Sequence, residues 1–147
     1  MDFKLRLMEA KDLALTLAWR NDPTVLRTAV TPNPISDKEH EAMFLHNNAI
    51  RLVFEVDGDP AGFVQVNRDP DELKGEWSFH MSKKYRGKKL SVIMLEATLY
   101  YLVTREGYKE VIAFVKEDNS VSEHLHQKLG FNDCGVKDGL IEFSKRL

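Results

Sequence analysis

Apolar and polar residues alternate with two different periods along the first third of the chain, and each period predicts one type of element. The alternation over Phe3–Leu7 is typical of a half-buried strand. Apolar residues recur at helical spacing over Ala10–Arg20, and we expect a short helix to follow from Pro23 to about Thr28. The range Ser36–Asn47 opens with a serine and a glutamate at capping-box spacing, which predicts a further helix.

The middle of the chain reads as strands. Leu52–Val56 and Ala61–Val66 flank an Asp-Gly-Asp-Pro sequence, and this pattern predicts a hairpin with a tight turn. After a polar loop, Trp77–Met81 carries apolar residues at every second position. Because side chains of a strand alternate between its faces, Glu76 and His80 are expected on one face of this strand.

The last third of the chain returns to alternating helices and strands. Leu90–Tyr101 is apolar almost all round, which predicts a deeply buried helix, and Val111–Val115 is typical of an interior strand. An amphipathic helix is expected over Ser120–Gly130, opened by a second capping box formed by its serine and a glutamate three residues later. Phe131–Val136 and Leu140–Phe143 are expected to end the chain as a strand pair.

Composition agrees with one α/β domain over residues 1–147, since 43% of the residues are hydrophobic. A net charge of −2 indicates neither nucleic acid nor a membrane surface as a partner. The single Cys134 excludes an intrachain disulfide, and no signal peptide or membrane span is evident. We therefore expect a cytoplasmic protein, a monomer or a homodimer. Metal binding is not expected, because no Cys/His cluster exists and His40 and His46 are not at i, i+4 spacing.

The basic segment Lys83–Ser91 carries the most informative chemistry. Five cations fall within its first seven residues, directly before the buried helix. Unpaired N–H groups at a helix start, with the positive end of the helix dipole, form a receptor for phosphate oxygens. The segment has neither a Walker A nor a Rossmann pattern. On its own, such a segment is more often a solvated loop.

Two motifs together resemble the GNAT acetyltransferase superfamily. The stretch Tyr85–Ser91 is similar to its pyrophosphate loop, Arg/Gln-x-x-Gly-x-Gly/Ala, and the range 119–131 is similar to its second signature, Asn-x-x-Ala-x-x-x-Tyr-x-x-x-Gly-Phe. Trp19–Asp22 loosely resembles branches that acetylate ribosomal-protein N-termini or nucleotide-linked amino sugars. The resemblance implies a central mixed, largely antiparallel sheet of about six to seven strands, flanked by about four helices. It also implies acetyl-CoA as co-substrate and a primary amine as acceptor.

The resemblance implies a role for each residue that matches the two motifs. Glu76 would be the base that removes the amine proton, and His126, where the family usually has tyrosine, would be the acid that protonates the CoA sulfur. The residues expected to contact acetyl-CoA are Met81, Arg86, Gly87, Lys88, Lys89, Leu90, Ser91 and Asn119. Plainer interpretations remain open: Glu76 as an exposed strand carboxylate, His126 on the solvent side of its helix, and Asn119 as a helix N-cap.

Departures from the family pattern keep two other functions open. Lys89 replaces the first loop glycine, and Ser91 stands at the second Gly/Ala position. If Lys89 adopts a positive φ, it costs about 1 kcal/mol or more. A non-catalytic CoA-binding module is therefore the alternative to an enzyme, and a nucleic-acid-binding domain that uses the basic segment is a weaker one. The acceptor stays open, because the expected flanking loops, 28–36 and 68–74, mix charges of both signs.

Overall fold

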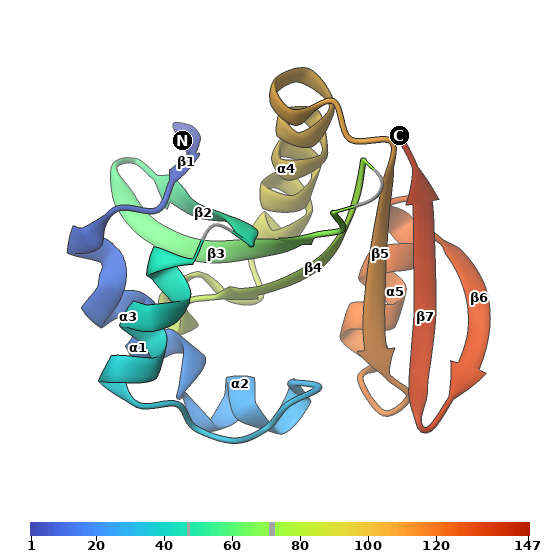
Figure 1. Ribbon diagram of the computed structural model, residues 1–147, viewed down its shortest axis with the longest axis horizontal. Coiled ribbons are helices and arrows are strands. Elements are labelled where there is room, and N and C mark those ends of the chain that lie inside the picture. Colours follow the sequence, from blue (N-terminus) through green and yellow to red (C-terminus); the bar gives the residue numbers. More distant parts are fainter. Residues whose placement is uncertain (47, 71–72) are drawn as a thin grey trace.

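A seven-stranded mixed sheet organises the computed structural model, which describes residues 1–46, 48–70 and 73–147 (Figure 1). The strand order is β1-β2-β3-β4-β5-β7-β6, and only the pair of β4 and β5 is parallel. The strands are β1 (Phe3–Leu7), β2 (Ala49–Val56), β3 (Asp59–Arg68), β4 (Lys74–Met81), β5 (Glu110–Lys116), β6 (Asn132–Lys137) and β7 (Leu140–Arg146). This sheet confirms the expected fold class.

Five α-helices cover the sheet within the described residues. They are α1 (Leu13–Arg20), α2 (Pro23–Thr28), α3 (Asp37–Leu45), α4 (Leu90–Glu106) and α5 (Ser120–Lys128). Short 3-10 turns precede α1 at Ala10–Asp12 and α4 at Lys83–Tyr85. Figure 1 shows α1 to α3 grouped on one side of β2 to β4, and α4 on the other.

Two apolar clusters explain why β2 is buried over nearly its whole length. Leu52 and Phe54 pack into the main core, which includes α4, whereas Val53 packs with Trp19 and Phe63 under α1. Because both faces of this part of the sheet are covered, the strand reads as a continuous apolar run rather than a strict alternation.

All five predicted helices are present, and α4 continues to Glu106, beyond the Tyr101 expected as its end. The helix expected over Ala10–Arg20 is divided into a 3-10 turn and α1. The capping box expected at the start of α5 is wrong: Asn119 is the N-cap, and its side chain accepts a hydrogen bond from the Ser122 N–H at 3.2 Å. Ser36 caps α3 as expected. The end of that predicted helix, Asn47, lies outside the described residues.

Candidate active site

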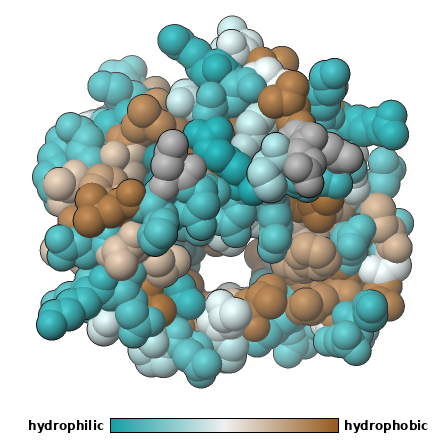
Figure 2. Space-filling view, in the orientation of Figure 1, coloured by the Kyte–Doolittle hydropathy of each residue, from teal (hydrophilic) through white to brown (hydrophobic). Residues whose placement is uncertain are grey.

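The site is built where β4 and β5 separate. Their ladder comprises Lys74–Glu110, Gly75–Val111 and Glu76–Ile112, and it stops there although both strands continue. In Figure 2 an opening passes through the molecule in the region that lies between these strands and α2 in Figure 1. A parallel pair that separates midway leaves backbone groups of both strands available to a ligand.

The hydrogen-bond register determines which N–H groups of β4 face the opening. Bonds to β3 at both ends of the strand join Asp69 N–H to Lys74 O at 3.1 Å, and Ser82 N–H to Ala61 O at 2.8 Å. In an antiparallel ladder, alternate residues face opposite neighbours. The backbone N–H and C=O groups of the even-numbered residues of β4 therefore point toward β3. Phe79 and Met81 direct their N–H groups to the other side, where β5 has already separated.

The loop before α4 has the conformation of an anion receptor. Gly87 and Lys89 both adopt a positive φ, 75° and 61°, and α4 begins at the next residue, Leu90. No side chain caps this helix start, so its first N–H groups point out of the loop. The side chain of Leu90 is buried in the core, which limits this residue to a backbone contact with a ligand. Ser91 is half-buried in the first turn.

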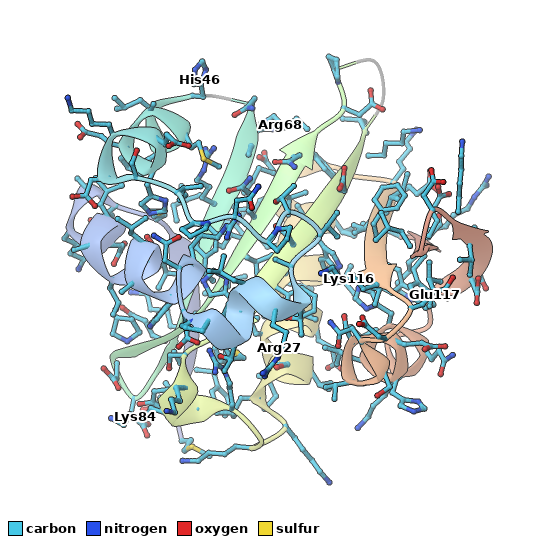
Figure 3. The ribbon with its side chains drawn as sticks, turned by 90° about the horizontal axis from the view of Figure 1, so that it is seen from below. Arg27, His46, Arg68, Lys84, Lys116 and Glu117 are labelled. Carbon is cyan, nitrogen blue, oxygen red and sulfur yellow. The ribbon has the colours of Figure 1, made fainter. Side chains whose placement is uncertain are left out.

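The five cations of the loop divide into two groups. Lys84 pairs with Asp59 at 3.1 Å, and Arg86 lies 3.8 Å from Asp22. Figure 3 shows Lys84 at the edge of the loop. Lys83, Lys88 and Lys89 are exposed. With two of the five charges directed at carboxylates of this chain, the loop is a smaller basic patch than its sequence suggests.

The Arg86 side chain points toward α2, away from the start of α4. Its Nε donates to the Met81 carbonyl at 3.0 Å, and its Nη1 donates to the Thr24 hydroxyl at 2.6 Å. The guanidinium thus links the loop to the N-terminus of α2. Any contact between Arg86 and a pyrophosphate would come from its backbone.

Glu76 stands at the point where β4 and β5 separate. It is the last β4 residue in the ladder with β5, and its side chain is exposed. The protein surrounding the carboxylate partly removes its water, and this raises the pKa of Glu76 above its ordinary value. A carboxylate with a raised pKa is a stronger base at neutral pH. Its position and exposure suit proton removal.

His126 does not have the geometry of an acid. It is 1% exposed, and its ring is surrounded by four aromatic side chains, those of Trp77, Phe79, Phe131 and Phe143. Trp77 Nε1 donates to His126 Nε2 at 3.0 Å, and His126 Nδ1 donates to the Ser122 carbonyl at 2.7 Å. Burial lowers the pKa of His126. Both ring nitrogens are thus occupied, and we correct the expectation of an acid, together with that of a solvent-facing histidine.

Asn119 lies at the start of α5 and caps it, which confirms the plainer interpretation of this residue. Its side chain is half-buried. The amide oxygen is used by the cap, which leaves the amide nitrogen for a ligand. The cap and a contact with the CoA arm are therefore compatible.

Sequence reasoning placed His80 on the Glu76 face but gave it no role. Its ring packs against Trp19 at 6.0 Å and Phe63 at 5.4 Å between ring centroids. Burial, together with the charges of Arg20 and Arg86, lowers the pKa of His80 to about 3. The ring is therefore neutral at physiological pH. Only the face shared with Glu76 could have drawn attention to this residue from sequence.

Within the described ranges, no three His, Cys, Asp or Glu residues are grouped as a metal site would require. In the same ranges, no helix combines the length and the apolar character needed to cross a membrane.

Comparison with known proteins agrees with this geometry. Residues 2–132 match the family described as Acetyltransferase (GNAT) domain. The chain is 33% identical over 81 residues to a mycothiol acetyltransferase of Corynebacterium efficiens. The matched segment covers 54% of this chain and 27% of that protein. The chain therefore spans about a quarter of the length of this curated relative.

Two solved structures show the same fold over nearly the whole chain. One is a spermidine N-acetyltransferase from Vibrio cholerae in complex with CoA and spermine, with a TM-score of 0.86, 19% identity, and coverage of 98% of this chain and 95% of that one. The other is a domain from Methanocaldococcus jannaschii, with a TM-score of 0.85, 20% identity, and coverage of 99% of both chains. At these identities the likeness concerns the fold alone. The family match over residues 2–132 shows more: the chain belongs to the GNAT acetyltransferase family.

Proposed function

We propose that the protein transfers an acetyl group from acetyl-CoA to a primary amine by direct attack in a ternary complex. The observation that carries this proposal is the separation of β4 from β5 beside an uncapped helix start. The opening in Figure 2 offers access from two sides, so that the two substrates could enter independently. The pyrophosphate of CoA would lie against Gly87, Lys88, Lys89 and the first N–H groups of α4.

The thioester would lie along the free edge of β4. The N–H of Met81 would donate to the carbonyl oxygen of the thioester and stabilise the negative charge that develops on it. Phe79 presents a second N–H on the same edge, nearer to Glu76. At a rise of about 3.3 Å per residue, Phe79 is about 10 Å and Met81 about 16 Å from Glu76 along the strand. A water-mediated proton path from the amine to Glu76 is therefore required, and it is shorter from Phe79.

The reaction needs one base. The amine nitrogen attacks the thioester carbon, the new C–N bond forms, and the C–S bond breaks. Glu76 takes the proton that the nitrogen loses, through water. We assign no protein group as the acid, because His126 has no free nitrogen. The thiolate would take its proton from solvent in the opening.

Glu76→Gln tests this assignment. Removing the base should lower kcat by about 100-fold or more, with KM for acetyl-CoA unchanged, measured by titration of the free thiol with a panel of amines. Because the pKa of Glu76 is raised, the wild-type rate should fall on acidification at a pH above that expected of an ordinary carboxylate. Glu142→Gln is a matched control, since Glu142 lies on β7 opposite Phe114. Equal rates for wild type and Glu76→Gln would refute the mechanism.

A non-catalytic CoA-binding module is the second candidate. It is favoured by one observation, the loss of a usable acid at His126. Calorimetry with acetyl-CoA separates the two functions: binding without turnover of any amine identifies the module, and turnover identifies the enzyme. Absence of binding would contradict both.

A further inference from the structure

Four buried side-chain atoms of the described residues lack a hydrogen-bond partner, and their residues are grouped around the C-terminal end of β4. The atoms are Arg20 Nη1, His80 Nε2, Ser82 Oγ and Arg86 Nη2. Arg20 ends α1, next to Trp19, whose ring packs on His80. Ser82 directly follows β4. An unpaired buried polar atom costs about 1 to 3 kcal/mol, so four in one place suggest a site for a ligand.

The charge of this cluster is positive. Burial and the charges of Arg20, Arg86 and His40 lower the pKa of His80, whereas the Asp22 carboxylate raises it. Asp22 lies 3.8 Å from Arg86 Nη2, which is too long for a hydrogen bond. Asp22 also accepts hydrogen bonds from Thr24 at the start of α2. Two guanidinium groups thus face one carboxylate that is already engaged.

The protein holds both guanidinium groups in place while leaving one nitrogen of each without a hydrogen bond. Arg20 Nη2 donates to the Thr31 carbonyl at 3.0 Å, and Nη1 is left. In Arg86 the Nε and Nη1 atoms donate to Met81 and Thr24, and Nη2 has its ion pair with Asp22 at 3.8 Å but no hydrogen bond. Fixed guanidinium groups with free N–H donors are suited to binding a carboxylate or another oxyanion.

The cluster lies beside the proposed reaction centre. His80 shares the Glu76 face of β4 and is the neighbour of Met81, whose N–H faces the opening. Farther out, Lys116 Nζ donates to the Arg27 carbonyl at 3.3 Å, which joins the end of β5 to α2 (Figure 3). This contact places the Lys116 ammonium beside α2. A polycationic acceptor would be repelled here.

We propose that Arg20, His80 and Arg86 bind a carboxylate of the acceptor, so that the acceptor is a small amine of the amino-acid type. This inference rests on the proposed function and names its substrate class. A short acceptor fits the geometry, since the cluster and the free edge of β4 belong to adjacent residues.

Paired acceptors test the inference without any variant. Each amino acid is compared with its decarboxylated amine and with the aminophosphonate of the same skeleton, and spermidine is added as a polycation. We expect kcat/KM for the amino acid to exceed that for the decarboxylated amine by about 10- to 100-fold. Equal or better use of the decarboxylated amine or spermidine would overturn the inference. A tenfold preference for the phosphonate would overturn the assignment of a carboxylate.

Arg20→Gln locates the effect. It should raise KM for the amino acid by about 10- to 100-fold, abolish the preference over the decarboxylated amine, and leave KM for acetyl-CoA unchanged. Arg105→Gln, an exposed arginine in the last turn of α4, is the matched control. If Arg20→Gln does not fold, as judged by circular dichroism, Arg20→Lys replaces it and should retain part of the preference. An unchanged preference in a folded Arg20 variant would contradict the inference.

The two proposals fail in different ways. If acetyl-CoA is not bound or no amine is acetylated, the proposed function fails. If amines are acetylated without regard to a carboxylate, only this inference fails.

Discussion

At the residue scale, the substitutions that set this chain apart from the family pattern have different consequences. Lys89 adopts the left-handed conformation that the family pattern assigns to glycine, with φ of 61°. His126 has left the site altogether and become a core residue. The first change keeps the left-handed conformation in the loop before α4, whereas the second takes a chemical group out of the site.

Lys89→Gly should stabilise the protein. A non-glycine residue in the left-handed region destabilises the folded protein by about 1 to 2 kcal/mol. Glycine removes this cost, but it loses more conformational entropy on folding, which offsets part of the gain. We expect the free energy of unfolding of the ligand-free protein to rise by about 1 kcal/mol in urea titration. Lys88→Gly makes the same change of charge at a neighbour without a positive φ, and it should bring no gain. Equal effects of the two variants would show that the backbone of Lys89 is not strained.

At the element scale, a hydrogen bond and ring contacts join β4 to α5 beside the opening. The Trp77 indole on β4 donates to His126 on α5, and the aromatic rings around His126 extend this contact to β7. These contacts hold α5 against β4 at Trp77, the residue that follows the end of the β4–β5 ladder. His126 thus acts as a core residue that supports the opening.

Acidification tests the neutral state of His126. Because its folded pKa is lowered, the unfolded chain binds more protons below about pH 6.5, and stability falls as pH falls. His126→Phe should weaken this dependence by up to about 1.4 kcal/mol per pH unit, measured by urea unfolding from pH 7 to 4.5. His124→Gln, at an exposed position of α5, is the control for loss of a histidine from this helix. An unaltered slope in the His126 variant would mean that this ring is protonated in the folded protein.

At the scale of the whole molecule, the opening lies between two parts of the chain that meet along the short β4–β5 ladder and through the main apolar core. β5 continues into the group formed with α5, β6 and β7, while β1 to β4 carry α1 to α3 on one side and α4 on the other (Figure 1). A ligand in the opening would contact both parts. It should therefore stabilise the complete fold.

Acetyl-CoA should raise the Tm of the protein in a concentration-dependent way. A ligand that binds only the folded state adds about 2.7 kcal/mol at 100 times its Kd. Acetyl-pantetheine, which lacks the pyrophosphate, should give a much smaller shift at the same concentration, because it leaves the start of α4 unoccupied. Differential scanning calorimetry measures both. Equal shifts would place the affinity outside the loop before α4.

The sequence alone determined the order of elements and the position of the basic loop before α4, because both depend on local patterns. The period of the apolar residues predicted the seven strands and the position of α4, and the spacing of two motifs predicted the family. The expectation of a deeply buried helix was wrong, because only one face of α4 is buried and Tyr100 is exposed. Gly107 ends α4 in the left-handed conformation that glycine adopts readily at a helix C-terminus. These features involve residues that are close together in the chain.

Only the tertiary structure decided which side chains face the opening. His126 meets Trp77 across 49 positions of sequence, and Arg86 reaches Thr24 across 62, so no local pattern could reveal either contact. The point where β4 and β5 separate is likewise set by packing between elements. The chemistry of the site therefore depends on long-range contacts, whereas the fold that carries it depends on the period at which apolar residues recur along the chain.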